Sequence, residues 1–174
     1  MELEQLTALE EIRQLKYRYI RAMDTHDWEL MGACFTDDAT TAFSDGLYSM
    51  HGRAEILDFF RRVVTNVVSS HVVSQPEIVF LHPGLARGVW RLEDTIVSGA
   101  PSGAGELRGA AYYYDEYTLV SDAWKIRHSG YRRIFKVFTP ADALVGSNID
   151  TYPTQGRYFG WLGEDAPAAP TGPS

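Results

Sequence analysis

The chain has 174 residues, a formal net charge of −7 and 45% hydrophobic residues. This composition is typical of one globular domain with a sizeable core, and it excludes general disorder. The acidic balance leaves no basic stripe that could neutralise phosphates, so we expect no nucleic-acid partner. There is no apolar run long enough to span a bilayer, and the acidic N-terminus does not resemble a signal peptide, so we expect a cytoplasmic protein without a membrane segment.

The first third of the chain predicts three helices and two short strands. Apolar residues recur at steps of three or four over residues 6–23, which indicates an amphipathic helix. Asp27 is placed to cap a second, shorter helix, in which the single cysteine, Cys34, is expected to be a core residue rather than a nucleophile. Two strands joined by a turn at residues 44–46 and a third helix, with Phe60 on its apolar side, complete this part.

The middle of the chain reads as sheet. Long strands are expected over residues 71–80, 86–97, 106–120 and 123–136, separated by short turns, and this pattern favours antiparallel hairpins. Helices followed by strands predict an α+β fold, with the helices packed on one concave face of a curved antiparallel sheet. Residues 1–140 are expected to form the domain. Residues 141–174 form a tail, whose aromatic part is expected to pack over a pocket or a partner and whose end is expected to be disordered.

Five polar residues stand on faces that otherwise read as apolar, namely Tyr19, Asp24, His71, Asp94 and Arg133. Because burying such groups without partners is costly, they are expected either to pair with one another or to perform chemistry in one apolar pocket. Each also has a structural interpretation. Tyr19 suits a core position, Asp24 a helix end and His71 the start of a strand. Asp94 and Arg133 could form a salt bridge that joins two strands.

Strand alternation predicts the walls of this pocket. Asp94 shares a strand face with Trp90, and Arg133 shares one with Tyr131 and Phe135. Since Trp124 and Tyr131 differ in parity, a β-bulge is expected near Ser129 and Gly130. The expected pocket residues are Phe60, Trp90, Tyr113, Tyr131 and Phe135.

The sequence contains no metal-binding spacing of histidines or cysteines and no glycine-rich nucleotide motif. We therefore expect neither a metal nor another cofactor. The five polar residues instead favour acid–base chemistry on a small hydrophobic ligand.

The order and spacing of residues 15–28, Ser70-His71, residues 91–94 and residues 130–133 resemble the SnoaL-like branch of the nuclear-transport-factor-2-like superfamily. Within it, the likeness is to the bile acid 7α-dehydratases and, more loosely, to the scytalone dehydratases. The resemblance implies a conical α+β barrel that forms a homodimer or homotrimer. It also implies that all five polar residues are catalytic, while Ser74 replaces a second histidine of the dehydratases.

These considerations predict a dehydratase acting on a steroid, terpenoid or polyketide. His71 would remove a proton next to a carbonyl, and Tyr19 would assist the oxygen. An isomerase, a polyketide cyclase or an epoxide hydrolase on the same fold are alternatives. A further alternative is a non-catalytic subunit like the small subunit of ring-hydroxylating dioxygenases, which predicts a filled interior.

Overall fold

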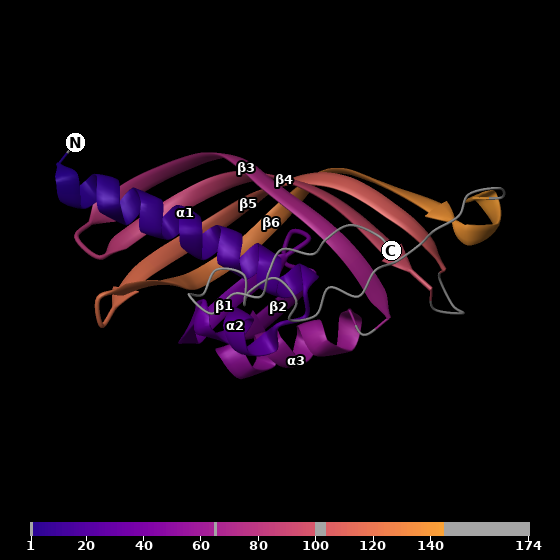
Figure 1. Ribbon diagram of the computed structural model, residues 1–174, viewed down its shortest axis with the longest axis horizontal. Helices are drawn as coiled ribbons and strands as arrows, with labels where there is room; N and C mark the ends of the chain where they lie inside the picture. Colours follow the sequence, from indigo (N-terminus) through magenta and orange to yellow (C-terminus); the bar gives the residue numbers. More distant parts are fainter. Residues whose placement is uncertain (1, 65, 100–103, 145–174) are drawn as a thin grey trace, which may run out of the picture.

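A computed structural model describes residues 2–64, 66–99 and 104–144. Three helices come from the first part of the chain: α1 (Leu3–Asp24), α2 (Trp28–Ala33) and α3 (Arg53–Val63). The strands are β1 (Phe35–Phe43), β2 (Tyr48–His51), β3 (Val67–His82), β4 (Leu85–Ser98), β5 (Gly105–Val120) and β6 (Ala123–Pro140). The four long strands arch over the molecule and α1 runs along the underside of the arch (Figure 1). The α+β prediction is therefore confirmed.

The first two helices have the buried stripe and the N-terminal cap that the sequence predicted. The stripe of α1 that the sequence predicted is buried from Ile12 onward, through Leu15, Tyr19 and Met23. Its first member, Leu6, is 51% exposed. The side chain of Asp27 accepts a hydrogen bond of 2.9 Å from the Leu30 amide, so it caps α2 as expected. These contacts fix the end of α1 against the sheet.

The six strands form one sheet in the order β2-β1-β6-β5-β4-β3. Neighbouring strands are antiparallel, with the exception of β1 and β6, which pair in parallel. The expectation of a purely antiparallel sheet is wrong at this pair, because no hairpin joins two strands so far apart in the chain and their direction is free. The sheet is strongly curved but open, with β2 and β3 at its two edges.

Two bulges shape β6, and neither lies at Ser129 or Gly130. The register steps from Glu116↔His128 to Tyr117↔Ile126, which leaves Arg127 as an extra residue. A second step, from Ala110↔Phe135 to Ala111↔Arg133, leaves Ile134 extra. The first bulge places the side chains of Tyr131 and Arg133 on the concave face of the sheet. The second bulge reverses the alternation, so that Phe135 lies on the outer face.

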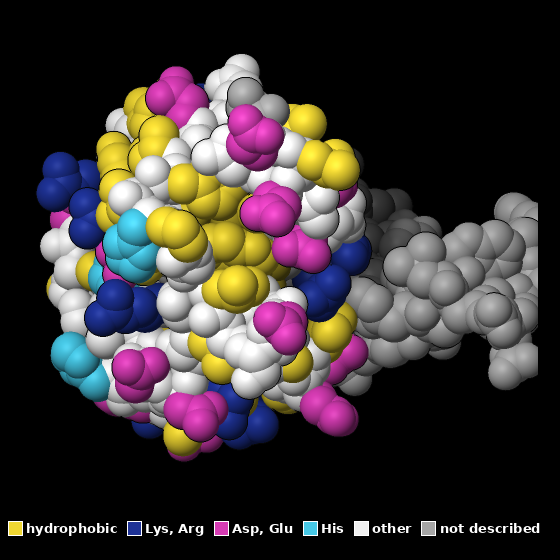
Figure 2. All heavy atoms as spheres, turned by 90° about the vertical axis from the view of Figure 1, so that its left-hand side faces the viewer, with side chains coloured by type: hydrophobic (Ala, Val, Ile, Leu, Met, Phe, Trp, Pro, Cys, Tyr) yellow, Lys and Arg dark blue, Asp and Glu magenta, His cyan; other side chains and the backbone are white. Residues whose placement is uncertain are grey.

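One end of the molecule carries an exposed apolar patch. It lies where the N-terminus of α1 meets the β3–β4 and β5–β6 turns, with acidic side chains along one side of it and histidine and basic side chains along the other (Figure 2). Its exposed members include Leu3, Leu6, Leu81, Leu119 and Val120.

A short 3₁₀ turn, Ala141–Leu144, follows β6 directly at the start of the expected tail. The expectations for the rest of the tail, both its packing and its disordered end, lie outside the described residues. No helix in the described part of the chain is long and apolar enough to cross a membrane.

Candidate active site

The end of α1 and the start of β3 meet at a carboxylate–imidazole pair. Asp24 accepts hydrogen bonds from His71 Nδ1 at 2.6 Å, from the His71 amide at 2.8 Å and from Ser69 Oγ at 2.8 Å. Because an ionised carboxylate can only accept, the ring proton of His71 belongs on Nδ1. The lone pair of Nε2 is then free to take a proton.

His71 opens into a cavity of about 270 Å³ between the concave face of the sheet, α1, β2 and α3. Polar groups are few: Ser69, His71, Asp94 and Arg133. The remaining wall is apolar and aromatic, formed by Met23, Phe43, Tyr48, Phe59, Phe60, Val63, Val64, Val67, Leu92, Ile96, Tyr113 and Tyr131. Such a lining suits a small apolar ligand held at one end by a few polar contacts.

Asp94 and Arg133 form a bidentate ion pair at one side of this cavity, with both N···O distances at 2.6 Å. Their side chains are 1% and 19% exposed, respectively. Burial by itself lowers the pKa of Arg133, but the hydrogen bonds and charge of Asp94 outweigh it and raise that pKa above its ordinary value. The salt-bridge interpretation of these two residues is thus correct in geometry, and the pair also lines the cavity.

His71 and Asp94 are direct partners in the β3–β4 register. Side chains opposite one another on neighbouring strands lie about 5 Å apart at Cβ. The sheet therefore sets the Asp94–Arg133 pair beside the Asp24–His71 pair, and four of the five predicted polar residues meet in one place.

Tyr19, the fifth, lies one layer behind the cavity. It is completely buried, with its ring 5.3 Å from Phe35 and 6.5 Å from Tyr113. Its hydroxyl forms no hydrogen bond of standard geometry with the described residues, although it interacts with Tyr113. Burial, followed by the charge of Asp115, raises the pKa of Tyr19 well above its ordinary value. The pocket position expected for Tyr19 is wrong, because α1 presents Met23 there instead.

Three of the five predicted wall residues, Phe60, Tyr113 and Tyr131, do line the cavity. Trp90 does not, since it is fully buried and donates a hydrogen bond of 2.8 Å to the Tyr117 hydroxyl. Phe135 does not either, because the bulge at Ile134 turns it to the outer face of the sheet, where it is 51% exposed.

A second buried polar cluster was not predicted from the sequence. Lys16 Nζ lies 2.7 Å from Asp115 Oδ2 with both side chains fully buried. Asp115 also accepts hydrogen bonds from Tyr117 and Ser129. Burial lowers the pKa of Lys16, and Asp115 opposes this shift. The alternation that singled out Asp94 could have found Asp115, which lies between Tyr113 and Tyr117 on the same strand face.

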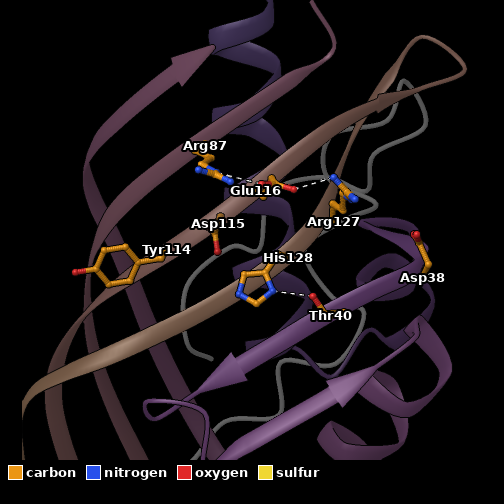
Figure 3. Close-up of a pocket in the computed structure, with 8 residues that line it drawn as sticks. All are labelled: Asp38, Thr40, Arg87, Tyr114, Asp115, Glu116, Arg127 and His128. Atoms are coloured by element: carbon orange, nitrogen blue, oxygen red, sulfur yellow. Dashed lines mark hydrogen bonds and ion pairs between the residues drawn. The ribbon is translucent and has the colours of Figure 1, made fainter. Parts of the chain in front are cut away.

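The outer face of the sheet has hollows of its own, but their chemistry is different. Figure 3 shows one, in which Glu116 binds both Arg87 and Arg127 while His128 contacts Thr40 at 2.7 Å. Glu116 is thus paired with two cations, and the hollow is open and polar. Among the described residues, no three histidine, cysteine or acidic side chains are grouped so that they could hold a metal ion.

Comparison with known families agrees with this architecture. A SnoaL-like domain is matched over residues 4–130, which is most of the chain. The chain belongs to the SnoaL-like family. The family assignment fits the order of elements and the cavity under the curved sheet.

Solved structures with the same fold as this SnoaL-like protein include several named enzymes. Hexachlorocyclohexane dehydrochlorinase LinA-type3 from Novosphingobium barchaimii has a TM-score of 0.73 and 20% identity, over 87% of this chain and 100% of that one. A proposed scytalone dehydratase from Novosphingobium aromaticivorans has a TM-score of 0.70 and 16% identity, over 83% and 97%. An uncharacterized cystatin-like protein from Caulobacter vibrioides reaches 0.64 at 18% identity, over 73% and 89%. At these identities the likeness shows the fold.

Proposed function

We propose that this SnoaL-like protein is an acid–base enzyme that needs no cofactor and eliminates water from a small cyclic β-hydroxy ketone. The observation that carries the proposal is the imidazole of His71, which Asp24 orients from behind and which faces an aromatic cavity. A histidine held by a carboxylate in an apolar site is suited to removing a proton from carbon.

In the first step, Nε2 of His71 takes the proton from the carbon next to the carbonyl. Asp24 keeps the ring in the required tautomer and stabilises the imidazolium that forms. The negative charge moves to the carbonyl oxygen as an enolate. A hydrogen-bond donor close to that oxygen lowers the energy of the transition state.

We assign the donor role to Tyr131 rather than to Tyr19. Tyr131 lines the cavity, and its hydroxyl oxygen accepts a hydrogen bond of 3.0 Å from Ser44 Oγ. Because that bond uses a lone pair, the phenolic proton is available for a ligand. Tyr19 supports Tyr113 from behind and does not touch the ligand in this scheme.

In the second step, the enolate expels the hydroxyl group from the next carbon. His71 now carries the proton that it removed, and it passes this proton to the departing hydroxide. Water leaves, a carbon–carbon double bond forms and His71 is neutral again, so no second acid is required. The Asp94–Arg133 pair borders the cavity beside His71 and orients the oxygen atoms of the ligand.

The size of the cavity favours a small ligand. Pockets for drug-sized molecules measure roughly 300–1,000 Å³, and this one is about 270 Å³. Of the substrate classes that the sequence suggested, a bicyclic polyketide or a small terpenoid fits better than a steroid.

The proposal can be tested with 3-hydroxy-1-tetralone, which becomes the fluorescent 1-naphthol when it loses water. We expect the wild-type protein to accelerate this reaction. His71→Ala should lower the rate by roughly 10² to 10⁴, the usual contribution of a general base. Tyr131→Phe should lower it by roughly 10², and Tyr19→Phe far less. If His71→Ala and Tyr131→Phe both react like the wild type, the proposal is wrong.

The same experiment separates the alternatives. An isomerase would exchange the hydrogen next to the carbonyl for deuterium in D₂O without forming 1-naphthol. A dehydrohalogenase, as the name of the LinA relatives suggests, would act on 3-chloro-1-tetralone and spare the alcohol. An epoxide hydrolase needs a second free carboxylate, and Asp24 is already engaged by His71.

A non-catalytic subunit like the small subunit of ring-hydroxylating dioxygenases was expected to have a filled interior, so the cavity favours an enzyme over this alternative. A homodimer or homotrimer remains our proposal for the assembly, which the molar mass in solution can test.

A further inference from the structure

We infer that Gly109 is a positioning residue of this site. It carries no side chain, and this gap lets Arg133 cross strand β5 to reach Asp94. That Gly109 makes room for the Asp94–Arg133 pair does not depend on the reaction. The effect of Gly109 on turnover rests on the proposed function.

The order of the strands creates the problem that Gly109 solves. Asp94 is on β4 and Arg133 is on β6, and β5 lies between them. In the register of the sheet Asp94 is opposite Gly109, while Arg133 is opposite Ala111. The guanidinium must therefore pass over β5 at the position of Gly109 before it can form its two bonds of 2.6 Å with Asp94.

A side chain at this position would occupy the same space. A Cβ atom built on Gly109 would lie 2.5 Å from Arg133 Nη1 and 2.9 Å from Asp94 Oδ1. It would also lie 3.1 Å from the Phe135 carbonyl oxygen. Cβ atoms in proteins essentially never lie closer than 3.0 Å to another heavy atom, so even the methyl group of alanine would force one of these groups to move.

Backbone conformation does not explain this glycine. The described glycines with positive φ are Gly46, Gly52, Gly84 and Gly105, and Gly109 is not among them. Its backbone suits any residue, and a glycine within a strand otherwise costs stability because it packs nothing. The physical reason for a glycine at position 109 is therefore that the ion pair occupies the space of a side chain.

The bulge at Ile134 completes the arrangement. Phe135, the next residue after the bulge, faces outward, so Arg133 is the last residue of β6 that lines the cavity. His71, Asp94 and Gly109 then form one row across β3, β4 and β5, and the Arg133 guanidinium lies over the empty place in that row.

Gly109→Ala is therefore expected to break the ion pair. Because the guanidinium is the flexible partner, it moves into the cavity that it already lines, and Asp94 is left without its cation. The cavity becomes smaller and more polar, so apolar ligands bind more weakly.

Three variants test this. Gly109→Ala is the test, and Gly88→Ala is the matched control, because a Cβ there would crowd Tyr117 and Trp90 at 3.1 and 3.2 Å but not the ion pair. Arg133→Met removes the group with which the new methyl collides. The probe is 1-naphthol, and its binding is measured by fluorescence titration.

In NMR spectra the bidentate pair should hold the Nη protons of Arg133 in separate, slowly exchanging signals, identified by their loss in Arg133→Met. We expect Gly109→Ala to merge these signals and to weaken 1-naphthol binding about tenfold, which corresponds to about 1.4 kcal/mol. Gly88→Ala should keep both. With 3-hydroxy-1-tetralone, Gly109→Ala should raise KM more than it lowers kcat, since the chemistry of the Asp24–His71 pair is untouched.

A cycle with Arg133→Met keeps the inference testable even when Gly109→Ala folds poorly. Adding Gly109→Ala to Arg133→Met should cost much less stability and binding than adding it to the wild type. Equal costs in both backgrounds, or unchanged Arg133 signals in Gly109→Ala, would overturn the inference. If the wild type binds 1-naphthol but forms none from 3-hydroxy-1-tetralone, the proposed function fails while the NMR and binding results still decide the role of Gly109.

Discussion

The carboxylate of Asp24 receives three hydrogen bonds from residues at the start of β3, and together they lock the direction of the His71 ring. Two of these bonds, from the His71 amide and from Ser69, would persist if the ring were removed. The ring is thus attached to a support that is already rigid, which is the condition for precise proton transfer.

Asp24→Asn is expected to lower turnover of 3-hydroxy-1-tetralone by roughly 10² or more, because an amide does not stabilise the imidazolium and can favour the wrong tautomer. Asp27→Asn is the matched control. It changes the next aspartate along the chain, whose role is to cap α2, and asparagine caps helices equally well. Equal rates for Asp24→Asn and wild type would contradict the role given to Asp24.

Cys34 is expected to be inert in the native protein. Its side chain is buried, and burial raises its pKa to about 11, so almost no thiolate exists at pH 8. Iodoacetamide should label Cys34 only after denaturation, as measured by mass spectrometry. Rapid labelling of the folded protein would mean that α2 opens or that the thiol is activated.

At the scale of single residues, four of the five polar residues singled out in the sequence, Asp24, His71, Asp94 and Arg133, lie together in the structure. All four stand out in the sequence against apolar neighbours. It could not place Tyr19, because an apolar helix stripe shows that a side chain is buried but not whether it meets a cavity or the core. Gly109 was not predicted for a related reason. The need for a glycine there follows only from the positions of Arg133 and Asp94, which the sequence does not give.

Between elements, the buried Lys16–Asp115 pair ties α1 to the middle of the sheet. Lys16→Met should destabilise the protein by roughly 3–5 kcal/mol, because it leaves the Asp115 charge buried without its cation. Urea unfolding measures this cost. The double variant Lys16→Met/Asp115→Asn should recover a large part of the loss, and a single variant as stable as the wild type would show that the pair matters little.

Which face of the sheet a strand residue occupies could be predicted from the sequence only in part. Alternation identified the inward face of β4 correctly, but β6 changes face twice within its length. The different parity of Trp124 and Tyr131 did predict one bulge in β6, which the structure has at Arg127. No residue pattern indicated the second bulge, at Ile134, because a bulge depends on pairing with the next strand. Phe135 was misplaced for that reason, although the element itself was predicted.

For the molecule as a whole, three buried phenols predict a sharp loss of stability in alkali. Burial is the largest cause that raises the pKa of Tyr19, Tyr113 and Tyr117. Above about pH 10 the unfolded chain releases these protons while the folded protein retains them, so the free energy of unfolding falls by about 1.4 kcal/mol per pH unit for each tyrosine.

Lys16 acts in the opposite direction, because its lowered pKa lets the folded protein release a proton first, but it is one group against three. Three tyrosines together remove about 4 kcal/mol per pH unit, so for a stability of about 5–15 kcal/mol circular dichroism should show cooperative unfolding between about pH 11 and pH 13. Phenolate absorbance of these residues should appear together with unfolding, and gradual ionisation in a folded protein would contradict the prediction.

The parallel pairing of β1 with β6 has a consequence for how the chain reaches its native state. β1 can pair with β2 as soon as both are synthesised, but its other edge pairs with residues 126–130 of β6, so that edge stays unpaired through most of translation. The three hairpins β3–β4, β4–β5 and β5–β6 can form from neighbouring segments in the meantime. We expect β1 to dock onto β6 after these hairpins have formed, which places a slow and aggregation-prone stage of folding late, when the cavity is completed.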